Sequence, residues 1–226
     1  HSDHAEGFLS TSSKYADRLI VEKVIHCQPR PDQLRPGEGS DYEAVKDRIV
    51  NGIKNFKGTN RSLEQIKAHP GMEIYIRDAK ITVLATIDTI EPKIISNVNN
   101  ASMVFKMEVG EKSIIFLGDS EPMQTKAMYK AFGEEYFRCD ALQLAHHGYH
   151  NTDAGPVYEI ADPTIVFWPV STGHYDGTGG ATVRDVSFNK RFFAPGIDNH
   201  IAGETNMTIK DFYSWLPEDE RWNPMK

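Results

Sequence analysis

The sequence is poor in cysteine, has no long hydrophobic run and carries no excess of basic residues. Cys27 and Cys139 are the only two cysteines among 226 residues, too few for a disulfide framework or a thiolate metal site, although one disulfide is feasible. No apolar run approaches the ~20 residues that a membrane-spanning helix needs. The cysteines leave a cytoplasmic and a secreted location in a bacterium both open.

The charge balance is acidic, with a formal net charge of −7. This balance argues against an extended surface for duplex nucleic acid, because Lys and Arg dominate binding to phosphates. A small or single-stranded phosphorylated substrate remains compatible, since a bound divalent metal can dominate the local field.

The length and composition fit one soluble globular domain that spans residues 1–226. Hydrophobic residues make up 39% of the chain and charged residues 25%. The first residue, His1, lies inside a motif described below. We therefore expect the natural protein to start upstream of His1, together with any targeting segment.

The pattern of apolar residues predicts helices and strands in alternation. Apolar steps of three and four residues predict a helix over 41–56, with Asp41 as its N-cap and Gly58 just past its end. A further helix is expected over 121–132 and another over about 5–15. Strands are expected over 18–27, 72–77, 80–87, 101–109, 112–117, 141–145 and 164–170, with strand-like pieces near 191–194 and 206–210. Paired strands with helices between them indicate layered α/β packing.

Three clusters of residues carry metal-ligand chemistry. The first is His1-Ser2-Asp3-His4, in which closely spaced imidazoles and a carboxylate can point into one volume and would suit Zn, Mn or Fe. The alternative is a polar N-terminal tail that binds no metal. In the second cluster, an apolar strand runs directly into Gly118-Asp119, although Asp119 could also simply cap the next helix.

The third cluster, His146-His147-Gly148, also follows a short buried strand. Two adjacent histidines face opposite sides of a continuing strand, so we expect one to be a ligand and the other to contact substrate or a ligand. A pair of surface histidines is the alternative. The occurrence of all three clusters in one chain favours a shared metal site.

The order His-x-Asp-His, Asn-Asn-Ala-Ser, Leu-Gly-Asp and His-His-Gly resembles the metallo-β-lactamase superfamily, and within it the ComEC-type hydrolase branch. The resemblance runs from His1 to about Val170 and is most specific from Asn99 to Gly148. It implies a four-layer αββα sandwich, here expected to lack its first strands. It also implies a metal-dependent hydrolase that activates water, with a phosphodiester-type substrate and one or two ions, zinc first and Mn or Fe as alternatives.

The resemblance also implies roles for individual residues. His1, Asp3 and His4 match the end of the first motif, whose first histidine would lie two positions before His1. Asp119 matches a carboxylate that bridges two metals. His146 matches the late ligand, with His147 as the alternative.

One ion would then keep a full ligand set in Asp3, His4, Asp119 and His146, whereas a second would keep only His1 and Asp119. Catalytic roles are expected for Asp3, Asp119 and the late His174, although His174 could equally be a loop residue.

Two further expectations concern the middle of the chain and the rival functions. Asn100 and Ser102 are expected to line the site, and His69, beside Pro70, to be structural. The rivals are a degenerate, non-catalytic binding domain, a hydrolase of lactones, thioesters or β-lactams, and a copper site at a processed His1. A histidine two residues before His1, preceded by an apolar strand, would favour the catalytic interpretation over the degenerate one, and unchanged turnover in Asp119→Ala would remove Asp119 from the mechanism.

Overall fold

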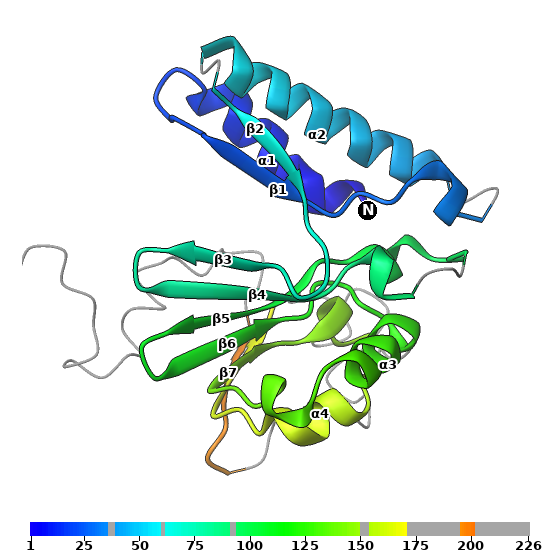
Figure 1. Ribbon diagram of the computed structural model, residues 1–226, viewed down its shortest axis with the longest axis vertical. Helices are drawn as coiled ribbons and strands as arrows, with labels where there is room; N and C mark the ends of the chain where they lie inside the picture. Colours follow the sequence, from blue (N-terminus) through cyan, green and yellow to red (C-terminus); the bar gives the residue numbers. More distant parts are fainter. Residues whose placement is uncertain (36–38, 60–61, 91–93, 150–153, 171–194, 202–226) are drawn as a thin grey trace, which may run out of the picture.

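The computed structural model describes residues 1–35, 39–59, 62–90, 94–149, 154–170 and 195–201. The described elements form four layers: a pair of helices, a two-stranded sheet, a seven-stranded sheet and a second group of helices (Figure 1). The predicted layered α/β architecture is confirmed. Within the described residues, no helix combines the length and the apolarity that crossing a bilayer requires.

The N-terminal layers contain two helices and two parallel strands: α1 (Ser2–Tyr15), β1 (Lys23–His26), α2 (Gly39–Thr59) and β2 (Glu64–Lys67). Apolar side chains recur at helical spacing on α1 and α2 and close a small core between the helices and β1. Ile53 and Phe56 of α2 are buried there, and Phe8 of α1 packs against them.

The bounds of α2 differ from the prediction at both ends. The helix begins at Gly39, so Asp41 lies inside it rather than at its N-cap. It also continues through Gly58 to Thr59. Apolar periodicity marks the buried face of a helix, whereas the terminal turns of α2 lie outside that pattern and were missed.

The large sheet has the order β3-β4-β5-β6-β7-β8-β9. Its strands are β3 (Glu73–Ile76), β4 (Ala79–Ala85), β5 (Val104–Val109), β6 (Lys112–Phe116), β7 (Ala141–Gln143), β8 (Ile165–Trp168) and β9 (Asp198–Ile201). Neighbours are antiparallel from β3 to β6 and parallel from β6 to β9. The strand-like pieces expected at 191–194 and 206–210 lie outside the described residues.

Both antiparallel hairpins close with two-residue turns, as expected from the sequence. Ile76 pairs with Ala79 across Arg77-Asp78, and Val109 pairs with Lys112 across Gly110-Glu111. The first central residues have positive φ angles, 55° at Arg77 and 57° at Gly110. Such angles match the right-handed twist of the flanking strands.

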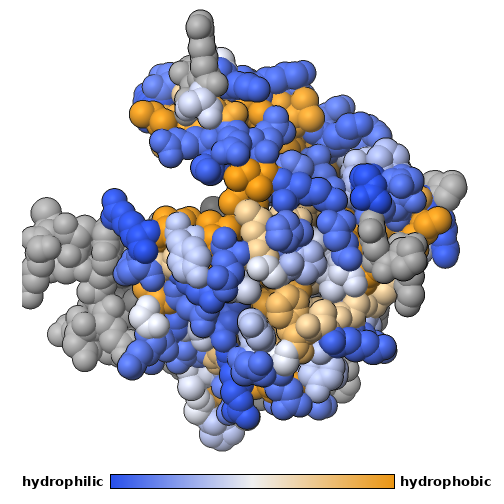
Figure 2. Space-filling model, viewed as in Figure 1, coloured by the Kyte–Doolittle hydropathy of each residue, from blue (hydrophilic) through white to orange (hydrophobic). Residues whose placement is uncertain are grey.

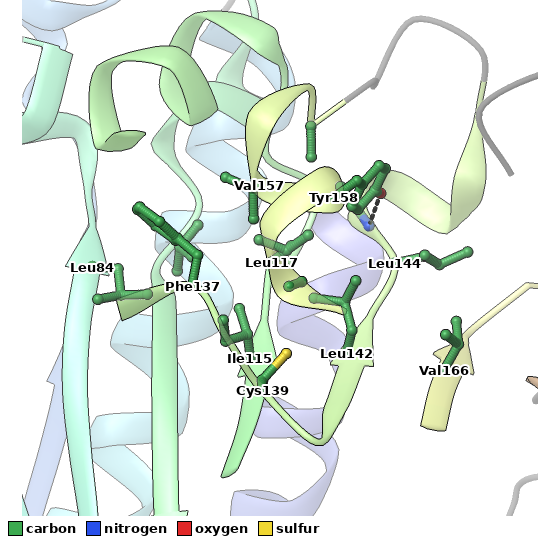
Figure 3. Close-up of a cluster of buried hydrophobic side chains, with 14 of the residues drawn as sticks. Leu84, Ile115, Leu117, Phe137, Cys139, Leu142, Leu144, Val157, Tyr158 and Val166 are labelled. Carbon is green, nitrogen blue, oxygen red and sulfur yellow. Dashed lines mark hydrogen bonds between the residues drawn. The ribbon is translucent and has the colours of Figure 1, made fainter. Parts of the chain in front are cut away.

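Helices α3 (Pro122–Ala131) and α4 (Pro156–Ala161) cover the outer face of the large sheet (Figure 1). Figure 3 shows the core between them and the strands, in which Leu117, Phe137 and Leu142 are fully buried. The hydroxyl of Tyr158 is satisfied within this core because it accepts the Ala145 N–H at 3.0 Å. The core thereby fixes the chain at Ala145, directly before His146.

Short 3-10 turns complete the described structure: η1 (Pro31–Gln33), η2 (Ile87–Ile90), η3 (Val98–Ala101), η4 (Glu134–Tyr136) and η5 (Ala145–Gly148). The chain joins its N-terminal layers to the large sheet partly through a buried cluster around Leu34, Tyr42 and Ile95. The backbone N–H of Arg35 donates to Ile95 O at 2.9 Å, which fixes the two parts along this seam.

Candidate metal centre

Two neighbouring parallel strands deliver polar side chains to the same edge of the sheet. Strand β6 is followed by Leu117, Gly118 and Asp119, and β7 is followed by η5, which carries His146 and His147. Phe116 at the end of β6 pairs with Gln143 at the end of β7. Side chains beyond these carboxyl ends therefore meet, as they do at sites in open α/β sheets.

Asp119 is held by backbone contacts as well as by burial. Gly118 before it has a φ of 56°, and a Cβ at Gly118 would lie 3.2 Å from the Cβ of Ser102. Ser102 Oγ accepts the Asp119 N–H at 3.1 Å, and Gln143 Oε1 accepts the Gly118 N–H at 2.8 Å. Only glycine combines this angle with this close approach, so the Gly-Asp pair sets the direction of the carboxylate.

The first histidine of the centre comes from the far layer of the molecule. His4 lies on α1, and its Nε2 is 2.8 Å from Asp119 Oδ2 across 115 residues of sequence. A carboxylate oxygen can only accept a hydrogen bond, so the Nε2–H of the His4 ring donates to Asp119. The contact places the N-terminal motif and the Leu-Gly-Asp motif at one point in space.

The second histidine is His147, whose Nε2 lies 3.6 Å from Asp119 Oδ1. Its Nδ1 contacts the carbonyl oxygen of Pro169, which directly follows β8. A carbonyl only accepts, so the proton of the neutral ring is on Nδ1 and the lone pair of Nε2 faces Asp119. A backbone carbonyl behind a ring nitrogen is the usual way to orient a metal-ligating histidine.

His4, Asp119 and His147 form a group that could hold a metal ion. Each residue offers one ligand atom, and these three atoms lie within 4.8 Å of one another. The rings of His4 and His147 are tilted by 35°, with centroids 5.7 Å apart, on either side of the carboxylate. The donor set of two imidazoles and one carboxylate leaves a coordination position open for water, as in catalytic zinc sites.

The electrostatics of the group keep the Asp119 carboxylate ionised. Burial opposes ionisation of Asp119, but the hydrogen bond from His4 and the neighbouring histidines outweigh it, so the pKa of Asp119 lies below its usual value. A carboxylate that is charged at neutral pH is the form that binds a cation.

His146 lies beside this group and faces a different partner. Its Nδ1 is 3.4 Å from Asn99 Nδ2 and 4.0 Å from Glu121 Oε1. Burial lowers the pKa of His146, although the Asp119 carboxylate opposes that shift. The structure thus brings His147, the alternative ligand, to Asp119 and directs Nδ1 of His146 toward Asn99 and Glu121.

Both histidines adopt left-handed backbone angles, which separates their directions. The φ angles are 43° at His146 and 55° at His147. Such angles are uncommon outside glycine, and they cluster at functional sites because the surrounding structure must hold them. Here the backbone is held at both ends, since His146 N–H donates to Gly118 O at 2.9 Å and Trp168 Nε1 donates to His147 O at 2.6 Å.

Glu121 organises the Asn-Asn-Ala-Ser stretch next to the site. Its carboxylate accepts from the side-chain amides of Asn97, Asn99 and Asn100, at 2.7, 3.3 and 3.2 Å. Asn100 also accepts the Gln124 N–H at 3.1 Å, which fixes the first turn of α3. The expectation that Asn100 lines the site is therefore replaced by a positioning role.

The remaining expected site residues are only partly placed. His1 is exposed and lines a cavity beside His4, without joining the three-residue group. The side chain of Asp3 and all of His174 lie outside the described parts of the structure. Ser102 lines the cavity and holds Asp119, whereas His69 is exposed, with its Nδ1 3.2 Å from Pro70 O.

Three residues that shape the centre were not predicted from the sequence. Glu121, Gln143 and Pro169 hold His146, Gly118 and His147 respectively, as described above. Glu121 stands two residues after Asp119, and that spacing at a helix start was the available signal. Gln143 and Pro169 act through contacts between strands, for which the local sequence has no signal.

Comparisons with known proteins give limited guidance. No protein-family model and no curated protein matches the chain. A protein from Parabacteroides distasonis described as a metal-dependent hydrolase shares 13% identity over 83% of this chain and 79% of its own, with a TM-score of 0.42.

CmlA, a diiron β-hydroxylase from Streptomyces venezuelae, shares 12% identity over 60% of this chain and 27% of its own, with a TM-score of 0.30. At these TM-scores the two likenesses do not decide a function.

Proposed function

We propose that the chain is a metal-dependent hydrolase whose centre is formed by His4, Asp119 and His147. The observation that carries this proposal is the convergence of their three ligand atoms within 4.8 Å. These residues come from α1 and from the ends of β6 and β7, so only the folded chain assembles them. Two imidazoles and one carboxylate suit zinc first, with manganese or iron as alternatives.

A divalent ion in this centre supplies two effects: it lowers the pKa of a bound water toward ~7, and it polarises the scissile bond. Asp119 offers one carboxylate oxygen to each histidine, so it can bind the ion and accept a hydrogen bond from the water. His147 is ready to bind because Pro169 holds its proton on Nδ1. His4 would bind an ion through a ring nitrogen that carries no proton, so its Nε2 proton would move to Nδ1 if Nε2 is the ligand atom.

We propose one tightly bound ion per chain, because the described residues assemble one such group. The motif alone adds Asp3, one residue before His4, as a further proposed ligand. The substrate first to be tested is a phosphodiester, which the motif resemblance favours. Hydrolysis of a carboxylic ester, thioester or lactone is the second candidate, and the apolar cavity beside the centre favours it.

Metal titration and an assay with bis-p-nitrophenyl phosphate and p-nitrophenyl acetate test the proposal. We expect one zinc per chain in calorimetry and turnover of at least one substrate that a chelator abolishes. Asp119→Ala should lose both zinc binding and turnover. Asp162→Asn is the matched control, because Asp162 lies after α4 at a φ of 44°, which asparagine tolerates.

The outcomes separate hydrolysis from the degenerate alternative. Zinc binding without turnover of either substrate would support a binding domain instead. Unchanged turnover in Asp119→Ala would remove this centre from the chemistry.

A further inference from the structure

A cavity of about 410 Å³ opens beside the metal centre, between the N-terminal layers and the large sheet. Its size falls in the range of small-molecule sites, about 300–1,000 Å³. In Figure 2, apolar surface gathers where the N-terminal layers meet the rest of the molecule, beside a hollow between them. The cavity is thus a space between layers rather than a gap within one core.

The wall of the cavity is mainly apolar and comes from several separate elements. Phe8 of α1, Val24 of β1 and Val45 and Ile49 of α2 form one side. Met103, just before β5, lies on the opposite side. Among the described residues, neither lysine nor arginine lines the cavity. An anionic part of a ligand would meet no lysine or arginine on these walls. An apolar part of a ligand would instead move from water into contact with apolar side chains, which is favourable.

The metal centre forms one end of the same cavity. His4 and Asp119 both line it, so a ligand in the cavity would touch the centre directly. Gln28, which also lines the cavity, has a buried side-chain Nε2 that makes no hydrogen bond within the described residues, and an unsatisfied buried donor is costly.

We infer that this cavity receives the acyl arm of a carboxylic ester, whose carbonyl group lies at the metal centre. The inference rests on the proposed function and names the substrate class of that same site. In the reaction, the oxygen of water bonds to the acyl carbon and the bond from that carbon to the alkoxy oxygen breaks. The alkoxy oxygen takes one proton of the water, and the other is released, leaving a carboxylate and an alcohol.

A series of p-nitrophenyl esters tests the inference with zinc-loaded protein. From acetate through butanoate and hexanoate to octanoate, we expect kcat/KM to rise by about fourfold per added methylene until the cavity is filled. Val45→Trp should flatten this rise, since the indole would occupy the space. Val50→Trp is the matched control, because Val50 is 37% exposed on the same helix and does not line the cavity.

Binding of octanoate to zinc-loaded protein gives a readout that does not depend on catalysis, because the ion can take the carboxylate while the cavity takes the alkyl chain. We expect saturable binding by calorimetry to the wild type and to Val50→Trp, and a loss of at least tenfold in affinity in Val45→Trp. Circular dichroism checks folding. If Val45→Trp does not fold, the ester series and octanoate binding of the wild type still test whether the cavity receives an acyl chain.

The failures of the two proposals are distinguishable. Zinc-dependent hydrolysis of bis-p-nitrophenyl phosphate with no chain-length preference among the acyl esters would overturn the acyl-arm inference and leave the hydrolase standing. Absence of octanoate binding would also overturn the inference. Octanoate binding without hydrolysis of any ester would overturn the hydrolase and, with it, the assignment of the arm to a substrate.

Discussion

The Nε2 atom of His4 and the Oδ2 atom of Asp119 lie 2.8 Å apart, although 115 residues separate them in the chain. The contact joins α1, on one outer layer, to the end of β6 in the large sheet. It is the point at which the N-terminal motif and the Leu-Gly-Asp motif become one site. His147 approaches the other oxygen of the same carboxylate at 3.6 Å.

The two adjacent histidines should differ in their effect on metal binding. Substituting a residue that only supports a metal ligand typically lowers metal affinity by about 10–100-fold. His147→Asn should lower zinc affinity by more than this, because it removes a metal-donor group beside Asp119. His146→Asn should stay within that range, since Nδ1 of His146 faces Asn99. Asparagine tolerates the left-handed angles of both positions. Calorimetry with zinc measures the difference, and an equal or larger loss in His146→Asn would make His146 the ligand.

Two glycines with nearly the same backbone angle form a matched pair for a stability measurement. Gly118 has a φ of 56° and Gly110 a φ of 57°, so Gly→Ala imposes the same left-handed strain of roughly 1–2 kcal/mol at both. A Cβ at Gly118 also meets Ser102 Cβ and Oγ at 3.2 and 3.3 Å, whereas nothing lies within 4 Å at Gly110. In urea unfolding, Gly118→Ala should therefore lose about 1–3 kcal/mol more than Gly110→Ala.

The same pair also reports on the site. Because Asp119 follows Gly118 and donates its N–H to Ser102, Gly118→Ala should weaken zinc binding. Gly110→Ala, in the distant β5–β6 turn, should leave it unchanged. Equal stabilities and equal affinities in the two variants would show that Ser102 does not constrain this turn.

Glu121 should matter for stability more than an exposed glutamate does. Glu121→Gln replaces an acceptor of three side-chain amides by a group that also donates, and leaves at least one buried amide poorly paired. We expect a loss of about 1–3 kcal/mol in the free energy of unfolding. Glu134→Gln is the control, since Glu134 is exposed and its carboxylate accepts the Tyr129 hydroxyl at 3.1 Å. Its effect should stay within about 0.5 kcal/mol.

The two cysteines should be unreactive in the folded protein and should make its stability fall at high pH. Burial raises the pKa of both Cys27 and Cys139 from 9.0 to about 12. Between these values the unfolded chain releases the thiol protons while the folded chain keeps them. The thiols therefore leave the free energy of unfolding unchanged below about pH 9. Above that pH they lower it, by up to about 1.4 kcal/mol per pH unit for each thiol.

Urea unfolding between pH 8 and 10.5 measures this slope. Cys27→Ala with Cys139→Ala is the control, because lysines and tyrosines that titrate in the same range remain. The double variant should show the shallower slope. At pH 8, a thiol reagent should label both cysteines only after denaturation, and rapid labelling of the native protein would contradict the burial of the thiols.

Most strands of the large sheet and the Gly118-Asp119 turn could be predicted because their signals are local, whereas β2 (Glu64–Lys67) was not expected. An apolar run that ends in Gly-Asp marks both a buried strand and the delivery of a carboxylate at its end. The parallel pairing of β6 and β7 then brings Asp119 close to the following histidines. Apolar periodicity likewise located the buried face of α2, although not its ends.

The different contacts of His146 and His147 could not be predicted. Strand alternation suggests opposite faces, but both residues lie in a turn with positive φ, and contacts to Gly118 and Trp168 hold that turn. These contacts depend on neighbouring strands. Strand β9 was missed for a similar reason: Asp198-Asn199-His200 is polar and pairs with β8 without any apolar pattern of its own.

Helix α1 carries His4 to the metal centre and also contributes Phe8 to the wall of the cavity. An ion bound by His4, Asp119 and His147 would tie this helix to the sheet and so set the width of the cavity mouth. By thermodynamic reciprocity, a ligand that spreads the layers apart would lower the affinity for the ion, and a ligand that fits the cavity would raise it. Metal binding and ligand binding would then be one coupled equilibrium, transmitted by a single helix.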